Sequence, residues 1–87
     1  MFEIFISHQA EKQYKKLDKK TKQRVNISIN NLSQYPFSGK HIKKLRGELE
    51  GKHRYAIGDI RIVYEIDTDV KAVKVLSIKS RGDVYKK

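Results

Sequence analysis

The sequence predicts a small α+β domain in which two helices cover one face of a mostly antiparallel sheet. Three observations predict it. Apolar residues recur with a helical period over residues 8–34 and with a period of two over residues 53–80. The 87 residues leave room for one core, so we expect a single domain over 1–87. Because the two helical segments follow one another, they should lie together on one side of the sheet, in the order β-α-α-β-β-β.

The first strand and the two helices follow from spacing and from capping residues. Residues 2–6 alternate as a strand does, and Ser7 can cap a helix over residues 8–17. Asp18 or Thr21 can cap the next helix, which should end at Tyr35-Pro36. The short connection between the helices predicts a hairpin. The apolar stripes are formed by Ala10, Tyr14 and Leu17, and then by Val25, Ile29 and Leu32.

The second half of the chain predicts an exposed loop followed by three strands. Residues 37–51 contain three glycines and few apolar residues, so we expect an irregular connection anchored by Ile42 and Leu45. Residues 53–57 and 60–66 should form a hairpin around Gly58-Asp59. Residues 71–80 are apolar on both faces, as a central strand would be.

Alternation along these strands places basic side chains on the face of the sheet that the helices leave open. With Tyr55 and Ile57 facing the core, Lys52, Arg54 and Ala56 face outward, and Arg61, Val63 and Glu65 do so from the next strand. In the last strand, inward Leu76 and Ile78 would put Ser77, Lys79 and Arg81 outward. An exposed strand arginine is ordinarily a solvated side chain, but convergence of three on one face favours a phosphate ligand.

The charge of the chain indicates a polyanionic partner. Twenty Lys and Arg against ten Asp and Glu give a net charge of +10, which suits nucleic acid or an acidic protein segment. A membrane surface fits poorly, because no basic helix carries a strong apolar stripe. The basic loop side chains are either solvated or in contact with phosphate, and they are Lys40, Lys43, Lys44 and Arg46.

Several other classes of protein are excluded or disfavoured by composition. No cysteine is present, so a disulfide framework and thiolate metal sites are excluded. No apolar run approaches the ~20 residues of a membrane span, and no leader pattern opens the chain, so we expect a cytoplasmic protein. Asp67 and Asp69 are placed as turn residues rather than metal ligands. We expect neither a metal nor a cofactor.

Three stretches of the chain resemble the RelE/ParE superfamily of toxins from toxin–antitoxin pairs, and the resemblance spans nearly all 87 residues. Its most specific parts are Lys44-Leu45-Arg46-Gly47, the stretch Arg54-Tyr55-Ala56-Ile57-Gly58-Asp59-Ile60-Arg61-Ile62-Val63-Tyr64-Glu65-Ile66, and the ending Ser80-Arg81-Gly82-Asp83-Val84-Tyr85. The resemblance implies a RelE-like fold and a cognate antitoxin, for which the charge of the chain suggests an acidic or amphipathic segment. RelE-type members are metal-independent endoribonucleases that cut mRNA in the ribosomal A site. ParE-type members instead poison DNA gyrase and lack the cleavage residues.

The resemblance also assigns roles by position. Arg61 matches the arginine that RelE-type enzymes place on the transition-state phosphate, and Arg81 matches one associated with the leaving group. Tyr85 matches a tyrosine that orients the nucleotide, and Arg54 falls where the family often has Lys or Arg on the second strand. Our hypothesis is that Arg54 and Lys52 support the phosphate. The chain departs from the pattern at Ala56, where some members have lysine, and at Ser80, where histidine often stands. The alternatives are a ParE-like gyrase inhibitor and a basic RNA-binding module without activity.

The group that would accept the proton of the 2′-hydroxyl is left open by the sequence. Arginine keeps its proton at neutral pH and serves poorly as a base. The candidates are Lys52 or Tyr85 among cationic neighbours, and His53 if the strand twists enough to expose it. The remaining alternative is that the ribosome orients the RNA and no side chain acts as a strong base.

Overall fold

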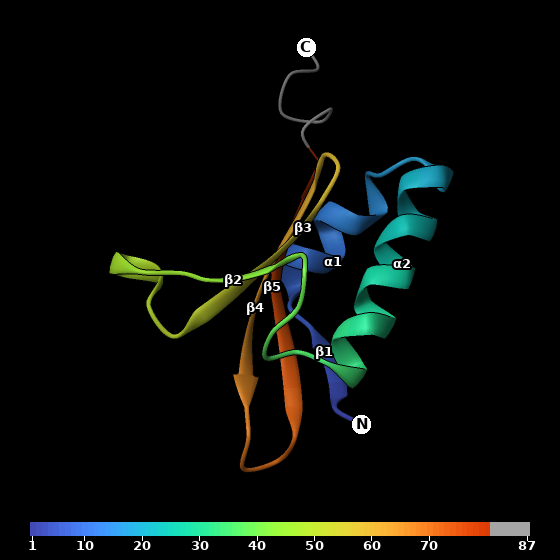
Figure 1. Ribbon diagram of the computed structural model, residues 1–87. Helices are drawn as coiled ribbons and strands as arrows, with labels where there is room; N and C mark the ends of the chain where they lie inside the picture. The colour runs from blue at the N-terminus through green and yellow to red at the C-terminus, as the bar shows by residue number, and fades with distance from the viewer. Residues whose placement is uncertain (81–87) are drawn as a thin grey trace.

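A five-stranded sheet with two helices on one face makes up the part of the chain that a computed structural model describes, residues 1–80 (Figure 1). The predicted α+β class and the helical hairpin are confirmed. The elements are β1 (Glu3–Ile6), α1 (His8–Lys15), α2 (Lys19–Gln34), β2 (Ile42–Lys44), a 3₁₀ turn η1 (Gly47–Leu49), β3 (Lys52–Ile57), β4 (Ile60–Asp67) and β5 (Ala72–Ser80). Within these residues, neither helix has the length and apolar content needed to cross a membrane.

The strands are arranged in the order β1-β5-β4-β3-β2. β2, β3, β4 and β5 pair antiparallel in sequence order, whereas β1 pairs parallel to β5 at the opposite edge. β5 is therefore an inner strand, as expected. The helices lie on one side of the sheet, and the β2–β3 hairpin extends beyond them (Figure 1). One sheet face is covered by helices and the other is open.

Side-chain hydrogen bonds cap both helices and attach α1 to the sheet. Ser7 Oγ accepts a hydrogen bond from the Ala10 amide at 3.0 Å and donates one to the Leu76 carbonyl at 3.0 Å. Asp18, not Thr21, caps α2, because its Oδ1 accepts from the Thr21 amide at 2.7 Å. Gln13 Oε1 accepts from the Ile78 amide at 2.7 Å, where β1 no longer pairs with β5. α1 thus supplies hydrogen bonds that a neighbouring strand would otherwise make.

The core lies between the helices and the covered face of the sheet. Leu17, Val25 and Leu32 of the predicted helical stripes are buried in it, with Tyr14 and Ile29 packed against its border. Tyr64 is fully buried, and its hydroxyl donates to the Pro36 carbonyl at 2.7 Å. Burial, with Tyr55 adding to it, raises the pKa of Tyr64, so the hydroxyl keeps its proton and remains a donor.

We expect Tyr64→Phe to lower the free energy of unfolding by about 1–3 kcal/mol, because the buried Pro36 carbonyl would lose its partner. Urea unfolding of the two proteins measures the difference. Tyr14→Phe is the matched control, since the Tyr14 hydroxyl donates to Asn26 at an exposed site and its loss should cost within about 0.5 kcal/mol. Equal effects at the two positions would contradict the expectation.

Residues 37–51, expected to be irregular, contain the short strand β2 and the turn η1. β2 pairs with β3 through Ile42↔Tyr55 and Lys43↔Arg54. The expectation was wrong because a strand of three residues is too short to show alternation and is stabilised by its neighbour. Ile42 and Leu45 are partly buried, as their predicted anchoring role requires.

β5 departs from simple alternation at Leu76. Val75 pairs with Tyr64 and Ser77 pairs with Val63, so Leu76 is an extra residue without a partner in β4. Val75, not Leu76, occupies the core position and is fully buried. The predicted inward position of Leu76 was therefore wrong, because the irregularity shifts the alternation by one residue.

Candidate nucleic-acid interface

The open face of the sheet carries cations in rows that run across the strands. The pairing places Ala56, Arg61 and Lys79 in one row, and Lys43, Arg54, Val63 and Ser77 in the next. Lys52, Glu65 and Lys74 form a third row. Arg54 and Arg61 are diagonal neighbours on adjacent strands, so their Cα atoms lie roughly 7–8 Å apart. The register places these two arginines on one face, as predicted, with Lys52 and Lys79 beside them.

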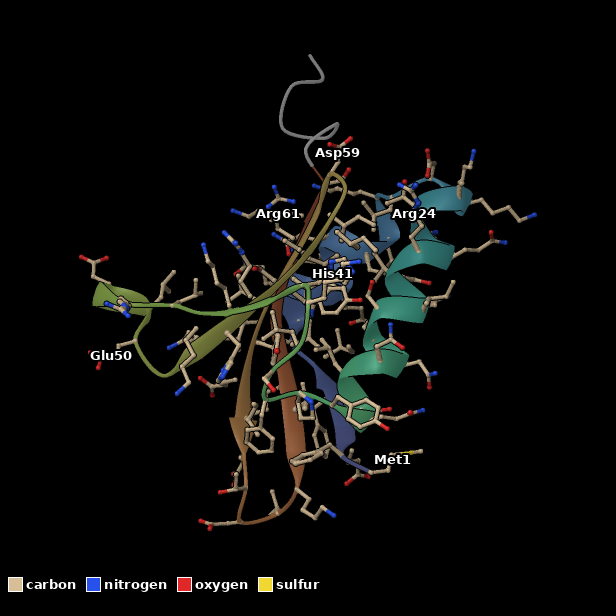
Figure 2. The ribbon with its side chains drawn as sticks, viewed as in Figure 1. Met1, Arg24, His41, Glu50, Asp59 and Arg61 are labelled. Atoms are coloured by element: carbon tan, nitrogen blue, oxygen red, sulfur yellow. The ribbon has the colours of Figure 1, made fainter. Side chains whose placement is uncertain are left out.

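Arg61 is held over the turn that joins β3 and β4. Its Nη1 donates to the Gly58 carbonyl at 2.9 Å and to the Ile60 carbonyl at 3.1 Å. Gly58 has a φ of +55°, a conformation that glycine adopts without steric cost. Figure 2 shows Arg61 on the open side of this hairpin and Arg24 on the helix side. Within residues 1–80 Arg61 forms no ion pair, so its other donors are available to an anion.

Arg54 lies on β3 between the rows of Arg61 and Lys52. It is partly buried, and its Nε has no hydrogen-bond partner among the described residues. Buried N–H groups normally have an acceptor, so this guanidinium is desolvated without full compensation. No described carboxylate forms an ion pair with it. A phosphate bound here would interact more strongly than one bound at a fully solvated cation.

Carboxylates border the cationic rows on the side of the turn between β4 and β5. Lys52 Nζ lies 3.8 Å from Glu65 Oε2, and Lys74 Nζ lies 4.0 Å from Asp67 Oδ2. Asp67 also accepts a hydrogen bond from the Asp69 amide at 3.0 Å, which is the turn role expected of it. The part of the chain that the structure describes holds no group of three His, Asp or Glu side chains suited to a metal ion.

His53 lies on the covered face and does not reach the open one. It is 9% exposed, and its ring stacks on that of Tyr64 with centroids 5.5 Å apart. Burial, with Lys44 adding to it, lowers the pKa of His53. The strand twist that would have exposed His53 as a base does not occur, because the ring packs against the core.

The lowered pKa makes stability depend on pH. An unfolded histidine takes up a proton near pH 6.5, whereas folded His53 resists it. The free energy of unfolding contributed by this group is present above about pH 6.5 and is lost as the pH falls below it, by at most about 1.4 kcal/mol per pH unit. We expect His53→Leu to lose less stability than the wild type between pH 7 and pH 5.5 in urea titrations. His8→Leu, at an exposed position, should follow the wild type.

The predicted loop cations surround the end of the β2–β3 hairpin. A pocket of about 1060 Å³ there is lined by Lys43, Lys44, Arg46 and Lys52, with Glu50 as its one carboxylate. Lys43 shares the open face with Arg54, while Lys44 pairs with His53 and therefore lies on the other face. Lys40 is exposed before β2 begins. These cations are thus spread over both faces of the hairpin rather than gathered beside Arg61.

Two predicted site residues, Arg81 and Tyr85, lie outside the described residues. β5 is described as far as Ser80, which pairs with Ile60, the neighbour of Arg61. Sequence reasoning missed the two carbonyls that hold Arg61, at Gly58 and Ile60. The Gly-Asp turn three residues before Arg61 was the only sequence signal for them.

The comparisons with known proteins agree with this fold. The family model described as the ParE toxin of the type II toxin–antitoxin system, parDE, matches residues 4–85. No curated protein matches the chain. Similar solved structures include the toxin–antitoxin complex RelBE2 from Mycobacterium tuberculosis, at 26% identity and a TM-score of 0.82, covering 92% of this chain and 98% of that one.

Two further structures extend the likeness. The archaeal RelE–RelB complex from Pyrococcus horikoshii is 27% identical with a TM-score of 0.78, covering 93% of this chain and 96% of the other. The isolated E. coli RelE toxin, at 20% identity, a TM-score of 0.79 and coverage of 98% and 92%, shows the shared fold. Since the family model spans almost the whole sequence, the chain belongs to the ParE toxin family of type II toxin–antitoxin systems, within the RelE/ParE superfamily.

Proposed function

We propose that this toxin is a metal-independent endoribonuclease that cuts mRNA in the ribosomal A site. The observation that carries the proposal is the placement of Arg54 and Arg61 on adjacent strands of one open face, neither of them in an ion pair within residues 1–80. Two guanidinium groups without a carboxylate partner among the described residues suit a ligand with several anionic oxygens.

The proposed chemistry matches what these side chains can supply. Cleavage requires charge stabilisation on the pentacoordinate phosphorus, and preorganised donors contribute about 3–4 kcal/mol each by analogy with oxyanion holes. Arg61 would contact the phosphate and Arg54 would support it, with Lys52 beside them. In the proposal, Arg81 serves the leaving group and Tyr85 stacks on the nucleotide, as the family resemblance implies.

The proposed setting is the cytoplasm, where mRNA lies on ribosomes. Lys40, Lys43, Lys44, Arg46 and Lys79 would add contacts to RNA phosphates around the site. The cognate antitoxin would neutralise the toxin with an acidic or amphipathic segment, since a net charge of +10 attracts such a partner. RelBE2 and the archaeal RelE–RelB pair are solved as complexes with their antitoxins.

A second candidate function is inhibition of DNA gyrase without catalysis. The match of the ParE toxin model to residues 4–85 favours it. In that case the open face would serve binding, and the arginines would contribute to affinity rather than to a chemical step.

Brief induction of the chain without its antitoxin, followed by primer extension on abundant mRNAs, separates the two functions. Discrete cuts that require translation are expected for the nuclease, and Arg81→Ala should abolish them together with toxicity. Double-strand DNA breaks with intact mRNA, and toxicity largely unchanged in Arg81→Ala, would instead establish the gyrase inhibitor.

A further inference from the structure

The open face needs a proton acceptor if it cleaves RNA, and the described cations cannot provide one. Lysine ammonium and arginine guanidinium groups are donors without an acceptor at neutral pH. His53, one of the bases considered from the sequence, is buried on the opposite face against Tyr64. Tyr85, another of them, lies outside the described residues. Among the described residues of the open face, carboxylates are the side chains that are ionised as bases at neutral pH and accept hydrogen bonds through both oxygens.

Glu65 is the carboxylate that the sheet brings nearest to Arg54. It lies on β4, on the same face as Arg61, and pairs with Lys52 of the neighbouring strand β3. Arg54 pairs with Val63, so Glu65 is its diagonal neighbour, at roughly 7–8 Å between Cα atoms. The Glu65 side chain is 38% exposed, and its Oε2 lies 3.8 Å from Lys52 Nζ. It is therefore accessible and already oriented by a cation.

The order of groups along the strands fits an in-line displacement. Glu65 and Arg61 are four residues apart on one strand face, a span of about 13 Å, and Arg54 lies between them on the neighbouring strand. Such a displacement needs a base on one side of the phosphorus and the leaving oxygen on the other. A phosphate that contacts both Arg61 and Arg54 would have Glu65 on one side, so the leaving oxygen would point to the opposite side.

We infer that Glu65 is the general base of the cleavage reaction, an inference that rests on the proposed endoribonuclease function. The Glu65 carboxylate takes the proton of the 2′-hydroxyl as the 2′-oxygen forms a bond to phosphorus. The bond between phosphorus and the 5′-oxygen breaks, and the leaving 5′-oxygen takes a proton from water. The products are a 2′,3′-cyclic phosphate and a 5′-hydroxyl, and Glu65 returns its proton to solvent.

Lys52 has a positioning role in this arrangement. Its ammonium faces Glu65 across the strands and would hold the carboxylate towards the phosphate on Arg54. A second ion pair, Lys74 with Asp67, has similar chemistry: Lys74 lies in the row of Glu65, but Asp67 lies two residues beyond Glu65 on β4. Asp67 therefore provides a control carboxylate on the same strand face, outside the reach of Arg54.

Single-turnover cleavage of a defined mRNA on programmed ribosomes, with the full chain, tests the inference. Glu65→Gln should slow cleavage by about 10²–10⁴-fold, the usual contribution of a general base. Its ribosome binding and thermal unfolding should be unchanged, and products from the wild type should end in cyclic phosphate. Asp67→Asn should cleave within about threefold of the wild type. Glu65→Ala, which keeps no amide, should be as slow as Glu65→Gln.

A double-mutant comparison with Lys52 distinguishes a base from an indirect effect. If Glu65 is the base, adding Glu65→Gln to Lys52→Gln should slow cleavage much further. No further loss would overturn the inference, since Glu65 would then act only by holding Lys52. Wild-type rates in Glu65→Gln would overturn it as well, while the proposed function would stand. A wild-type chain that cuts no mRNA would refute the proposed function itself.

Discussion

Replacing Arg61 with alanine is expected to slow mRNA cleavage by about 10²–10³-fold while leaving the fold intact. Arg61 is partly exposed on the open face, and its side chain bonds only to the Gly58 and Ile60 carbonyls among the described residues. Loss of one preorganised donor to a developing oxyanion costs about 3–4 kcal/mol in comparable sites. The measurement is the single-turnover rate on ribosome-bound mRNA, beside thermal unfolding of the same protein.

The control for this substitution removes the same charge elsewhere. Lys12 is exposed on α1, away from the sheet, so Lys12→Ala should cleave at nearly the wild-type rate. Arg61→Lys should recover only part of the activity, because an ammonium cannot bridge two carbonyls and still present a fork to phosphate. Wild-type cleavage by Arg61→Ala would remove the phosphate role proposed for this residue.

Ile62→Ala is expected to cost about 2–5 kcal/mol of unfolding free energy. Ile62 is fully buried in β4, where it pairs with Tyr55 on one side and Ile78 on the other. For a chain of 87 residues the total stability is of the order of 4–13 kcal/mol, so this loss is a large fraction of it. Urea unfolding followed by circular dichroism gives the value.

The matched control makes the identical substitution on a surface. Ile27 on α2 is 63% exposed and lies outside the stripe formed by Val25, Ile29 and Leu32. Ile27→Ala should change stability by within about 0.5 kcal/mol, since it leaves no cavity and alanine favours helix. If the two variants were equally destabilised, the core position assigned to Ile62 would be wrong.

Much of the architecture was readable from local periodicity. The helical stripe through Val25 and Leu32 and the alternation around Ile60 and Ile62 each follow from which face of an element is buried. The same alternation predicted that Arg54 and Arg61 would share a face, and the register places them on adjacent strands of it. A period of two repeats along the chain itself, so no distant contact is needed to detect it.

The proposed site was less predictable because its geometry depends on pairing between segments far apart in sequence. Three features of the site arise from contacts between strands or across their turn. The Gly58 carbonyl accepts from Arg61, Lys52 contacts Glu65, and the His53 ring stacks on Tyr64. A candidate base could therefore not be chosen from sequence. Lys52, Tyr85 and His53 were candidates, beside orientation of the RNA by the ribosome, while Glu65 was noted only for its face.

The class of fold, the two helical stripes and the basic open face follow from the sequence alone, since each is a property of neighbours along the chain. The parallel pairing of β1 with β5, the three-residue strand β2 and the shift at Leu76 emerge only when the chain is folded. These features exist because backbone groups of distant segments satisfy one another's hydrogen bonds, and such partners leave no periodic mark in the chain.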